Sequence, residues 1–92
     1  MKTRLKRVRS YEGQGRLLEN GSAVSYALHE YQETIPHGLK EIRGHIFLIS
    51  GSLPLLGSIS TLQLQDGREI KLISESGGGT SATVRATGGF VQ

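Results

Sequence analysis

Two dipeptides typical of β-hairpin turns, Asn20-Gly21 and Asp66-Gly67, constrain the fold of this chain more than any other feature. Both are flanked by short segments in which apolar and polar residues alternate. No window of about a dozen residues shows the apolar spacing of an amphipathic helix. The chain also has 13 glycines, which disfavour helices because glycine loses the most backbone entropy on folding. The sequence therefore predicts an all-β fold.

Turn residues divide the chain into six predicted strands, at residues 13–19, 22–31, 41–50, 59–65, 68–75 and 81–91. Residues 53–57 form at most one helical turn between the third and the fourth strand. Alternation predicts one inward-facing set of side chains: Val24, Tyr26, Leu28, Ile42, Ile46, Leu48, Ile70, Leu72, Ala82, Val84, Ala86 and Phe90. Phe47 and Ile49 are apolar on the outward face, so either something covers this face or it is a contact surface.

The first hairpin is predicted to have a tight loop. A two-residue turn of the mirror-image type at Asn20-Gly21 places Leu17 opposite Val24. In that register the apolar side chains of both strands lie on the same side of the sheet. A two-residue loop is therefore expected here.

The second hairpin is predicted to have a different loop. A two-residue turn at Asp66-Gly67 would place Leu62 opposite Lys71 and separate the two apolar faces, because a slip of one residue exchanges the faces of a strand. A three-residue loop, 65–67, with a left-handed Gly67 sets Leu62 opposite Ile70 instead. The longer loop is therefore expected.

The chain resembles a doubled unit. The two turn glycines lie 46 residues apart, half of the 92-residue chain, and a similar third strand follows each hairpin, around Arg43 and around Arg85. We therefore expect two three-stranded meanders related by a pseudo-two-fold axis. They would close into a small antiparallel barrel, which removes open sheet edges. A closed sandwich is the alternative.

The charge of the chain is uneven. Ninety-two residues provide one compact core, so we expect a single β domain at 11–92 and a basic arm or seventh, edge strand at 1–10. Five cations form the predicted anion-binding set of this arm: Lys2, Arg4, Lys6, Arg7 and Arg9. Such an arm can contact nucleic acid, anionic lipid or an acidic partner.

Several classes of protein are disfavoured. The chain has no cysteine, so it has neither disulfides nor a thiolate zinc site. No apolar run approaches the length of a membrane span, and no apolar stretch follows the basic start as in a secretory signal. A cytosolic protein without a cofactor is expected.

No catalytic constellation is evident. The one aspartate, Asp66, is needed by the hairpin turn, and no nucleophile motif is present. If a hairpin is centred on His37, then His29 lies opposite His45, and this pair could hold a divalent metal. Two exposed histidines explain the same pattern more simply, so no metal site is predicted and a noncatalytic protein is expected.

One segment has a partial family likeness. Residues 20–25, Asn-Gly-Ser-Ala-Val-Ser, resemble the N-x-S-x-x-G half of the signature in PilZ-type cyclic-di-GMP barrels, which are also six-stranded. Ser25 stands where that signature has Gly, and the arginine half is absent, although Lys2 and Lys6 have its spacing. The resemblance implies a cyclic dinucleotide as ligand. A hairpin turn followed by a strand explains the same residues.

The most concentrated apolar surface is the strand at 46–49 and the residues just after it. The predicted interface consists of Phe47, Ile49, Leu53, Leu55 and Leu56. We therefore expect a noncatalytic binding module that forms a homodimer or contacts a protein partner through this surface. The alternative is an anionic ligand, nucleic acid or a cyclic dinucleotide, bound by the basic arm.

Overall fold

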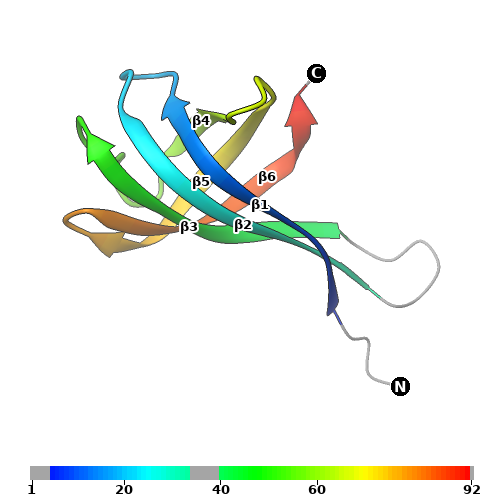
Figure 1. The fold of residues 1–92 in the computed structure, drawn as a ribbon. Coiled ribbons are helices and arrows are strands. Elements are labelled where there is room, and N and C mark those ends of the chain that lie inside the picture. Colours follow the sequence, from blue (N-terminus) through cyan, green and yellow to red (C-terminus); the bar gives the residue numbers. More distant parts are fainter. Residues whose placement is uncertain (1–4, 34–39, 92) are drawn as a thin grey trace.

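Six antiparallel strands form a closed barrel in the computed structural model, which describes residues 5–33 and 40–91 (Figure 1). The strands are β1 (Leu5–Leu17), β2 (Ala23–Glu33), β3 (Lys40–Ser50), β4 (Ile59–Gln63), β5 (Glu69–Gly78) and β6 (Ser81–Val91). The described residues contain no helix, so the all-β prediction is confirmed. Residues 53–57 lie in a loop with a turn at its end, where the Ser58 N–H donates to the Leu55 carbonyl at 3.1 Å.

The barrel consists of two meanders, as predicted. β1, β2 and β3 pair in sequence order, as do β4, β5 and β6, and the strand order is β1-β2-β3-β6-β5-β4. The two seams between the meanders differ in length. β3 and β6 pair from Phe47↔Ser81 to Arg43↔Arg85, whereas β1 and β4 have two partner pairs, Arg16↔Gln63 and Leu17↔Leu62.

The described part of the basic arm belongs to β1. This strand begins at Leu5 and pairs with β2 along its length, so the arm does not form a separate strand there. A bulge between Arg7 and Arg9 leaves Val8 without a partner. In Figure 1, the start of β1 and the end of β2 extend together beyond the barrel.

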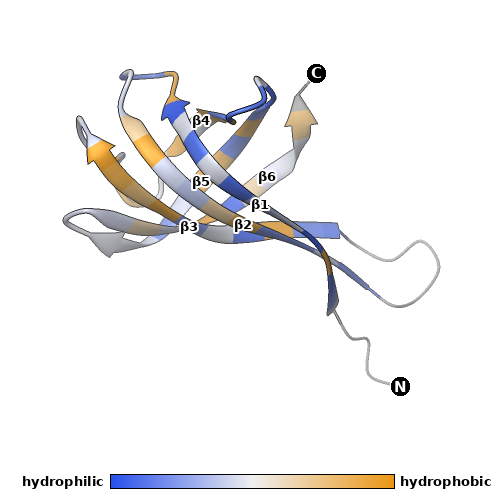
Figure 2. Cartoon of the chain, in the orientation of Figure 1, coloured by the Kyte–Doolittle hydropathy of each residue, from blue (hydrophilic) through white to orange (hydrophobic). Residues whose placement is uncertain are grey.

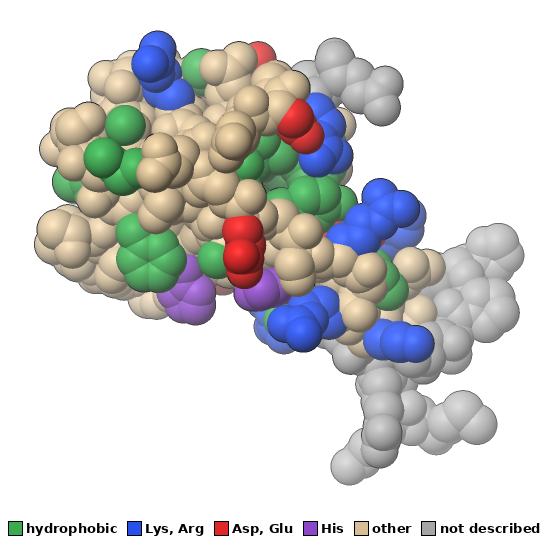
Figure 3. All heavy atoms as spheres, viewed as in Figure 1, with side chains coloured by type: hydrophobic (Ala, Val, Ile, Leu, Met, Phe, Trp, Pro, Cys, Tyr) green, Lys and Arg blue, Asp and Glu red, His purple; other side chains and the backbone are tan. Residues whose placement is uncertain are grey.

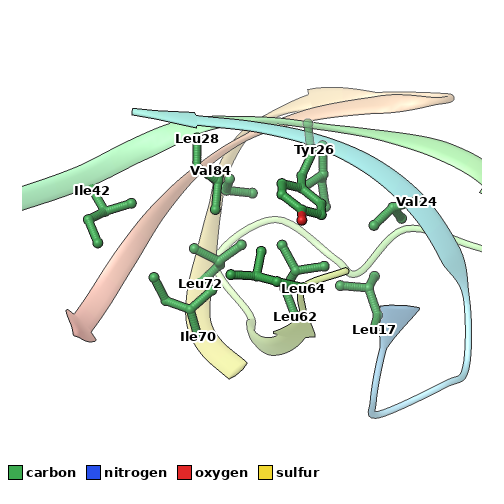
Figure 4. Packing of buried hydrophobic residues seen from close by; sticks show 12 residues of the cluster. Leu17, Val24, Tyr26, Leu28, Ile42, Leu62, Leu64, Ile70, Leu72 and Val84 are labelled. Carbon is green, nitrogen blue, oxygen red and sulfur yellow. The ribbon is translucent and has the colours of Figure 1, made fainter. Parts of the chain in front are cut away.

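The core lies between the two meanders (Figure 4). Its buried hydrophobic residues are Leu17, Val24, Tyr26, Leu28, Ile42, Ile46, Leu62, Leu64, Ile70, Leu72, Ala82 and Val84. Leu48, Ala86 and Phe90 are partly buried against them. The predicted inward set therefore faces the core, and the alternation is visible as orange and paler or blue bands along the strands in Figure 2. Burial of each large aliphatic side chain stabilises the fold by about 1.5–3 kcal/mol.

The second hairpin has the predicted loop. Leu62 is the partner of Ile70, and the Leu64 N–H donates to the Arg68 carbonyl at 2.7 Å. The loop therefore contains the three residues 65–67. Gly67 has a φ of 93°, the left-handed conformation that glycine adopts at low cost.

The first hairpin does not have the predicted two-residue turn. The Leu17 N–H donates to the Ser22 carbonyl, so the loop contains four residues and Val24 is the partner of Gly15 instead of Leu17. The cause is a contact with the β3–β4 loop. The buried Ser22 hydroxyl donates to the Ser52 carbonyl at 2.8 Å and accepts from the Ser52 N–H at 2.9 Å.

β6 bulges near its end. Ala86 is the partner of Leu72 and Phe90 is the partner of Ile70, so residues 87–89 together lie opposite Lys71. A bulge bends its strand and increases the local twist. The end of β6 consequently turns away from the start of β3, as Figure 1 shows.

Candidate functional site

Exposed apolar side chains gather in one part of the sequence. Five of the seven large hydrophobic residues exposed in the described chain come from residues 47–59. We call these residues, which are close in sequence, the apolar surface: Phe47, Ile49, Leu55, Leu56 and Ile59. Phe47 lies on β3 and Ile59 on β4, two strands that β6 and β5 separate in the barrel, and the loop with Leu55 and Leu56 connects them. The exposed fractions of these side chains run from 45% at Phe47 to 84% at Leu55, so solvent reaches much of each side chain.

Local backbone features expose these residues. Phe47 is on the outward side of β3, and Ile49 lies at a bulge where the β3 register shifts between its Leu48 and Ser50 pairs. The β3–β4 loop is held to β5 by the Gly57 N–H, which donates to the Ser74 carbonyl at 2.7 Å. A hollow of about 420 Å³ separates this loop from the glycines of the β5–β6 hairpin.

The predicted interface and the apolar surface overlap but are not identical. Phe47, Ile49, Leu55 and Leu56 are exposed, whereas Leu53 is partly buried against the core. Ile59 was missed by sequence reasoning. Ile59 could have been found from its outward position at the start of β4, where its partner is Ile73 on β5.

The basic arm is divided between two faces of the sheet. Lys2 and Arg4 lie outside the described residues, and Lys6, Arg7 and Arg9 are exposed on β1. The bulge makes Arg7 the partner of Tyr31 and Arg9 the partner of Glu30. Because neighbouring positions of β2 face opposite sides, these two arginines project from opposite faces.

Cations and aromatic rings lie together on the outer face of β2 and β3. The Arg43 guanidinium is 4.6 Å from the centre of the Tyr31 ring, and His45 stacks on Phe47 at 6.2 Å. His29 lies at 6.4 Å from Tyr31. We call these five side chains the outer strip. Figure 3 shows histidines, a hydrophobic ring and basic side chains near one another on this side of the molecule.

The predicted opposition of His29 and His45 is wrong. His29 is the partner of Arg43, and His45 is the partner of Ala27, a shift of two residues from the predicted register. His29 instead lies 3.0 Å from Ser10, Nδ1 to Oγ. His37 lies outside the described residues. Within the described residues, no group of three His, Cys, Asp or Glu side chains could hold a metal ion.

The pKa values of two carboxyl groups, Asp66 and Glu19, are lowered by contacts within the fold. A hydrogen bond from the Arg68 side chain lowers the pKa of Asp66 below its ordinary value of 3.8, and these groups close the second hairpin with an ion pair of 2.8 Å. Slight burial raises the pKa of Glu19, but the Thr61 N–H donates to Glu19 Oε1 at 2.7 Å, and the pKa is lowered overall. Both groups are bound within the fold.

One end of the barrel is covered by an aromatic and cationic cluster. Tyr11 from β1 and Phe90 from β6 meet edge to face, with ring centres 5.0 Å apart. The Arg68 guanidinium lies 4.5 Å from the Phe90 ring centre and 5.2 Å from that of Tyr11. The Tyr11 hydroxyl donates to Glu30 at 3.1 Å.

No protein-family model matches this chain, and no curated protein or solved structure is significantly similar to it. The residues that carry the PilZ-like resemblance have structural partners. Asn20 Oδ1 accepts from the Ser22 N–H at 2.9 Å, and Ser22 binds Ser52. The described chain contains no helix that is long and apolar enough to cross a membrane.

Proposed function

We propose that this protein is a noncatalytic binding module of the cytosol that self-associates through its apolar surface. The observation that carries the proposal is the concentration of exposed Phe47, Ile49, Leu55, Leu56 and Ile59 in one short stretch. Exposed hydrophobic residues that occur singly are normal, whereas a gathered set marks a contact region. The other two, Val8 and Leu18, lie elsewhere on the chain.

A second copy of the chain is the proposed occupant because the stretch is uncharged. No acidic or basic residue occurs between His45 and Asp66. In a two-fold dimer each residue of a patch meets the same patch on the other copy. Charges within such a patch would face like charges, whereas uncharged leucine, isoleucine and phenylalanine side chains can pair with themselves.

The test is the oligomeric state of Phe47→Glu by analytical ultracentrifugation. We expect a folded monomer, against a dimer for the unaltered protein. Leu55→Lys, in a loop residue that is 84% exposed, should have the same effect, and Val8→Glu should leave the dimer intact. A monomeric unaltered protein, or unfolding of Phe47→Glu together with a dimeric Leu55→Lys variant, would contradict the proposal.

The outer strip supports a second candidate, a single-stranded nucleic acid. Arg43 lies over Tyr31, and Arg7 on the neighbouring strand is the partner of Tyr31. Rings on a sheet face can stack with bases, and nearby arginines can contact phosphates. Part of the basic arm thus reaches the strip through β1.

This candidate is tested with a fluorescent thymidine oligonucleotide. We expect binding that weakens steeply as salt rises, and that is reduced by Tyr31→Ala and by Arg7→Gln. Lys71→Gln, on the outward side of β5, is the matched control. Because residues 5–9 belong to β1, single substitutions test the arm more cleanly than a truncation. Binding that does not change with salt or with Tyr31→Ala would exclude the strip, and Leu55→Lys separates this function from dimerisation.

A further inference from the structure

The seam between β3 and β6 ends before the strands do. The last partner pair is Arg43↔Arg85. Among the described residues, Lys40, Glu41 and Ile42 have partners in β2 but none in β6. Beyond Arg85, β6 pairs with β5 alone and bulges at residues 87–89. The start of β3 therefore presents an unpaired strand edge, at the position that a straight β6 would occupy.

A groove fills the space between the diverging strands. Its volume is about 780 Å³. Ile42, Ala86 and Phe90 give it an apolar floor, and all three also pack in or against the core. The groove therefore has a floor that is fixed by the rest of the fold.

Two glycines leave one wall of the groove without side chains. Gly88 and Gly89 line it, and a Cβ added to either would meet no atom within 4 Å. Neither glycine has a positive φ, so their backbone conformation does not require glycine. Glycine in a strand often marks a place where another backbone approaches closely.

The rim of the groove is acidic. Glu30, Glu33 and Glu41 line it, together with two cations, Lys40 and Arg85. Arg85 is already bound, because its Nε donates to Glu75 at 3.0 Å. Glu41 lies 4.0 Å from the Arg43 guanidinium, and Glu30 accepts from the Tyr11 hydroxyl at 3.1 Å. The rim as a whole carries three carboxylates against two cations, so its formal charge is negative.

We propose that the groove is an acceptor site for an extended basic peptide, which adds as a strand to the free edge of β3. The peptide takes the direction of β6 and pairs with Lys40, Glu41 and Ile42. Its apolar side chains contact Ile42 and Phe90, and its alternate lysine or arginine side chains reach the acidic rim. Strand addition of this kind derives affinity from main-chain hydrogen bonds and specificity from alternate side chains. The site is distinct from the apolar surface and does not depend on it.

The experiment measures binding of a fluorescent peptide in which lysine and valine alternate. The first comparison is the same peptide with N-methyl groups on the amides that face β3, which keeps its charge but removes its donors. Each lost hydrogen bond of about 1.4 kcal/mol corresponds to about tenfold in affinity. We expect at least that loss. Equal binding of the N-methylated peptide would overturn strand addition.

Protein variants locate the site. Gly88 lines the groove, and a Cβ at this position would meet no atom within 4 Å. We therefore expect Gly88→Val to keep an intact fold by circular dichroism and to bind about tenfold more weakly. Gly78→Val is the matched control, because Gly78 is also open and without a positive φ but lies at the other end of the barrel. It should bind normally. Equal binding by Gly88→Val would overturn the proposal.

Charge and occupant are tested separately. The Glu33→Gln and Glu41→Gln double variant should bind the peptide more weakly, and a peptide with glutamate in place of lysine should not bind. Backbone amide NMR shifts should be confined to residues 40–42 and 86–89. A dimer that Gly88→Val dissociates would instead mean that a second copy occupies the groove, which overturns the proposed occupant.

Discussion

Arg43 and Arg85 face each other as partners across the last pair of the β3–β6 seam. Like charges directly opposite in a sheet are destabilising. Each arginine has its own compensating groups: Arg43 lies over the Tyr31 ring and 4.0 Å from Glu41, and Arg85 is bound to Glu75. The seam therefore ends on two cations whose charges are directed to different neighbours.

Replacement of Glu75 by Gln should weaken the fold by less than about 1 kcal/mol, as is usual for a half-exposed ion pair. The loss should be smaller when Arg43→Gln is also present, because Arg85 then no longer faces a like charge. Urea denaturation of the four proteins of this double-mutant cycle gives the coupling. Equal losses in the two backgrounds would mean that the contribution of Glu75 does not depend on Arg43.

Stability should fall in acid partly because of Glu19. Its pKa is lower in the folded protein than the ordinary value of 4.5, so its stabilising contribution is complete above pH 4.5 and is lost as the pH falls through the folded pKa. Glu19→Gln keeps an oxygen that can accept from the Thr61 N–H but does not titrate. Urea midpoints below pH 4.5 should therefore depend less on pH in this variant. Identical pH profiles would contradict the assignment.

Gly15→Ala should weaken closure of the barrel. The added methyl group would overlap the carbonyl oxygen of Gln63, where β1 meets β4. Shifts of this kind usually cost about 1–3 kcal/mol. Gly78→Ala, which has open space around it, should be neutral or slightly stabilising. Thermal unfolding distinguishes these outcomes, and equal midpoints for the two variants would show that β1 and β4 can separate at no cost.

Ser74→Ala should stabilise the protein. The Ser74 hydroxyl is 1% exposed and has no hydrogen-bond partner among the described residues. A buried hydroxyl that lacks a partner costs about 1–3 kcal/mol, and alanine removes it while leaving a similar volume. The free energy of unfolding from urea titration should rise by about 1 kcal/mol. A decrease would mean that a water molecule or another group binds this hydroxyl in solution.

The sequence-based errors in register have a common cause. Alternation of side chains reveals a slip of one residue, because such a slip exchanges the faces, but it cannot detect a slip of two. The second hairpin required a choice between a loop of three residues and a loop of two, and the prediction of three was correct. The first hairpin and the His29–His45 pairing were each wrong by two residues, with every side chain still on its predicted face.

Long-range contacts decided what local patterns could not. The Ser22 hydroxyl donates a hydrogen bond to the carbonyl of Ser52, 30 residues away, and this contact accompanies the longer first loop. The two-meander closure was predictable because each half repeats the same hairpin pattern. The groove was not, because it depends on a bulge at residues 87–89 that shows in the sequence only as a glycine pair.

The unequal seams give the barrel a mechanical asymmetry. The two three-stranded meanders are connected by one loop, at residues 51–58. β3 and β6 are joined by five partner pairs, whereas β1 and β4 are joined by two. We expect the shorter β1–β4 seam to open before the longer β3–β6 seam, because fewer backbone hydrogen bonds hold it. The length of the β1–β4 seam therefore sets how readily the closed barrel opens into a six-stranded sheet with two free edges.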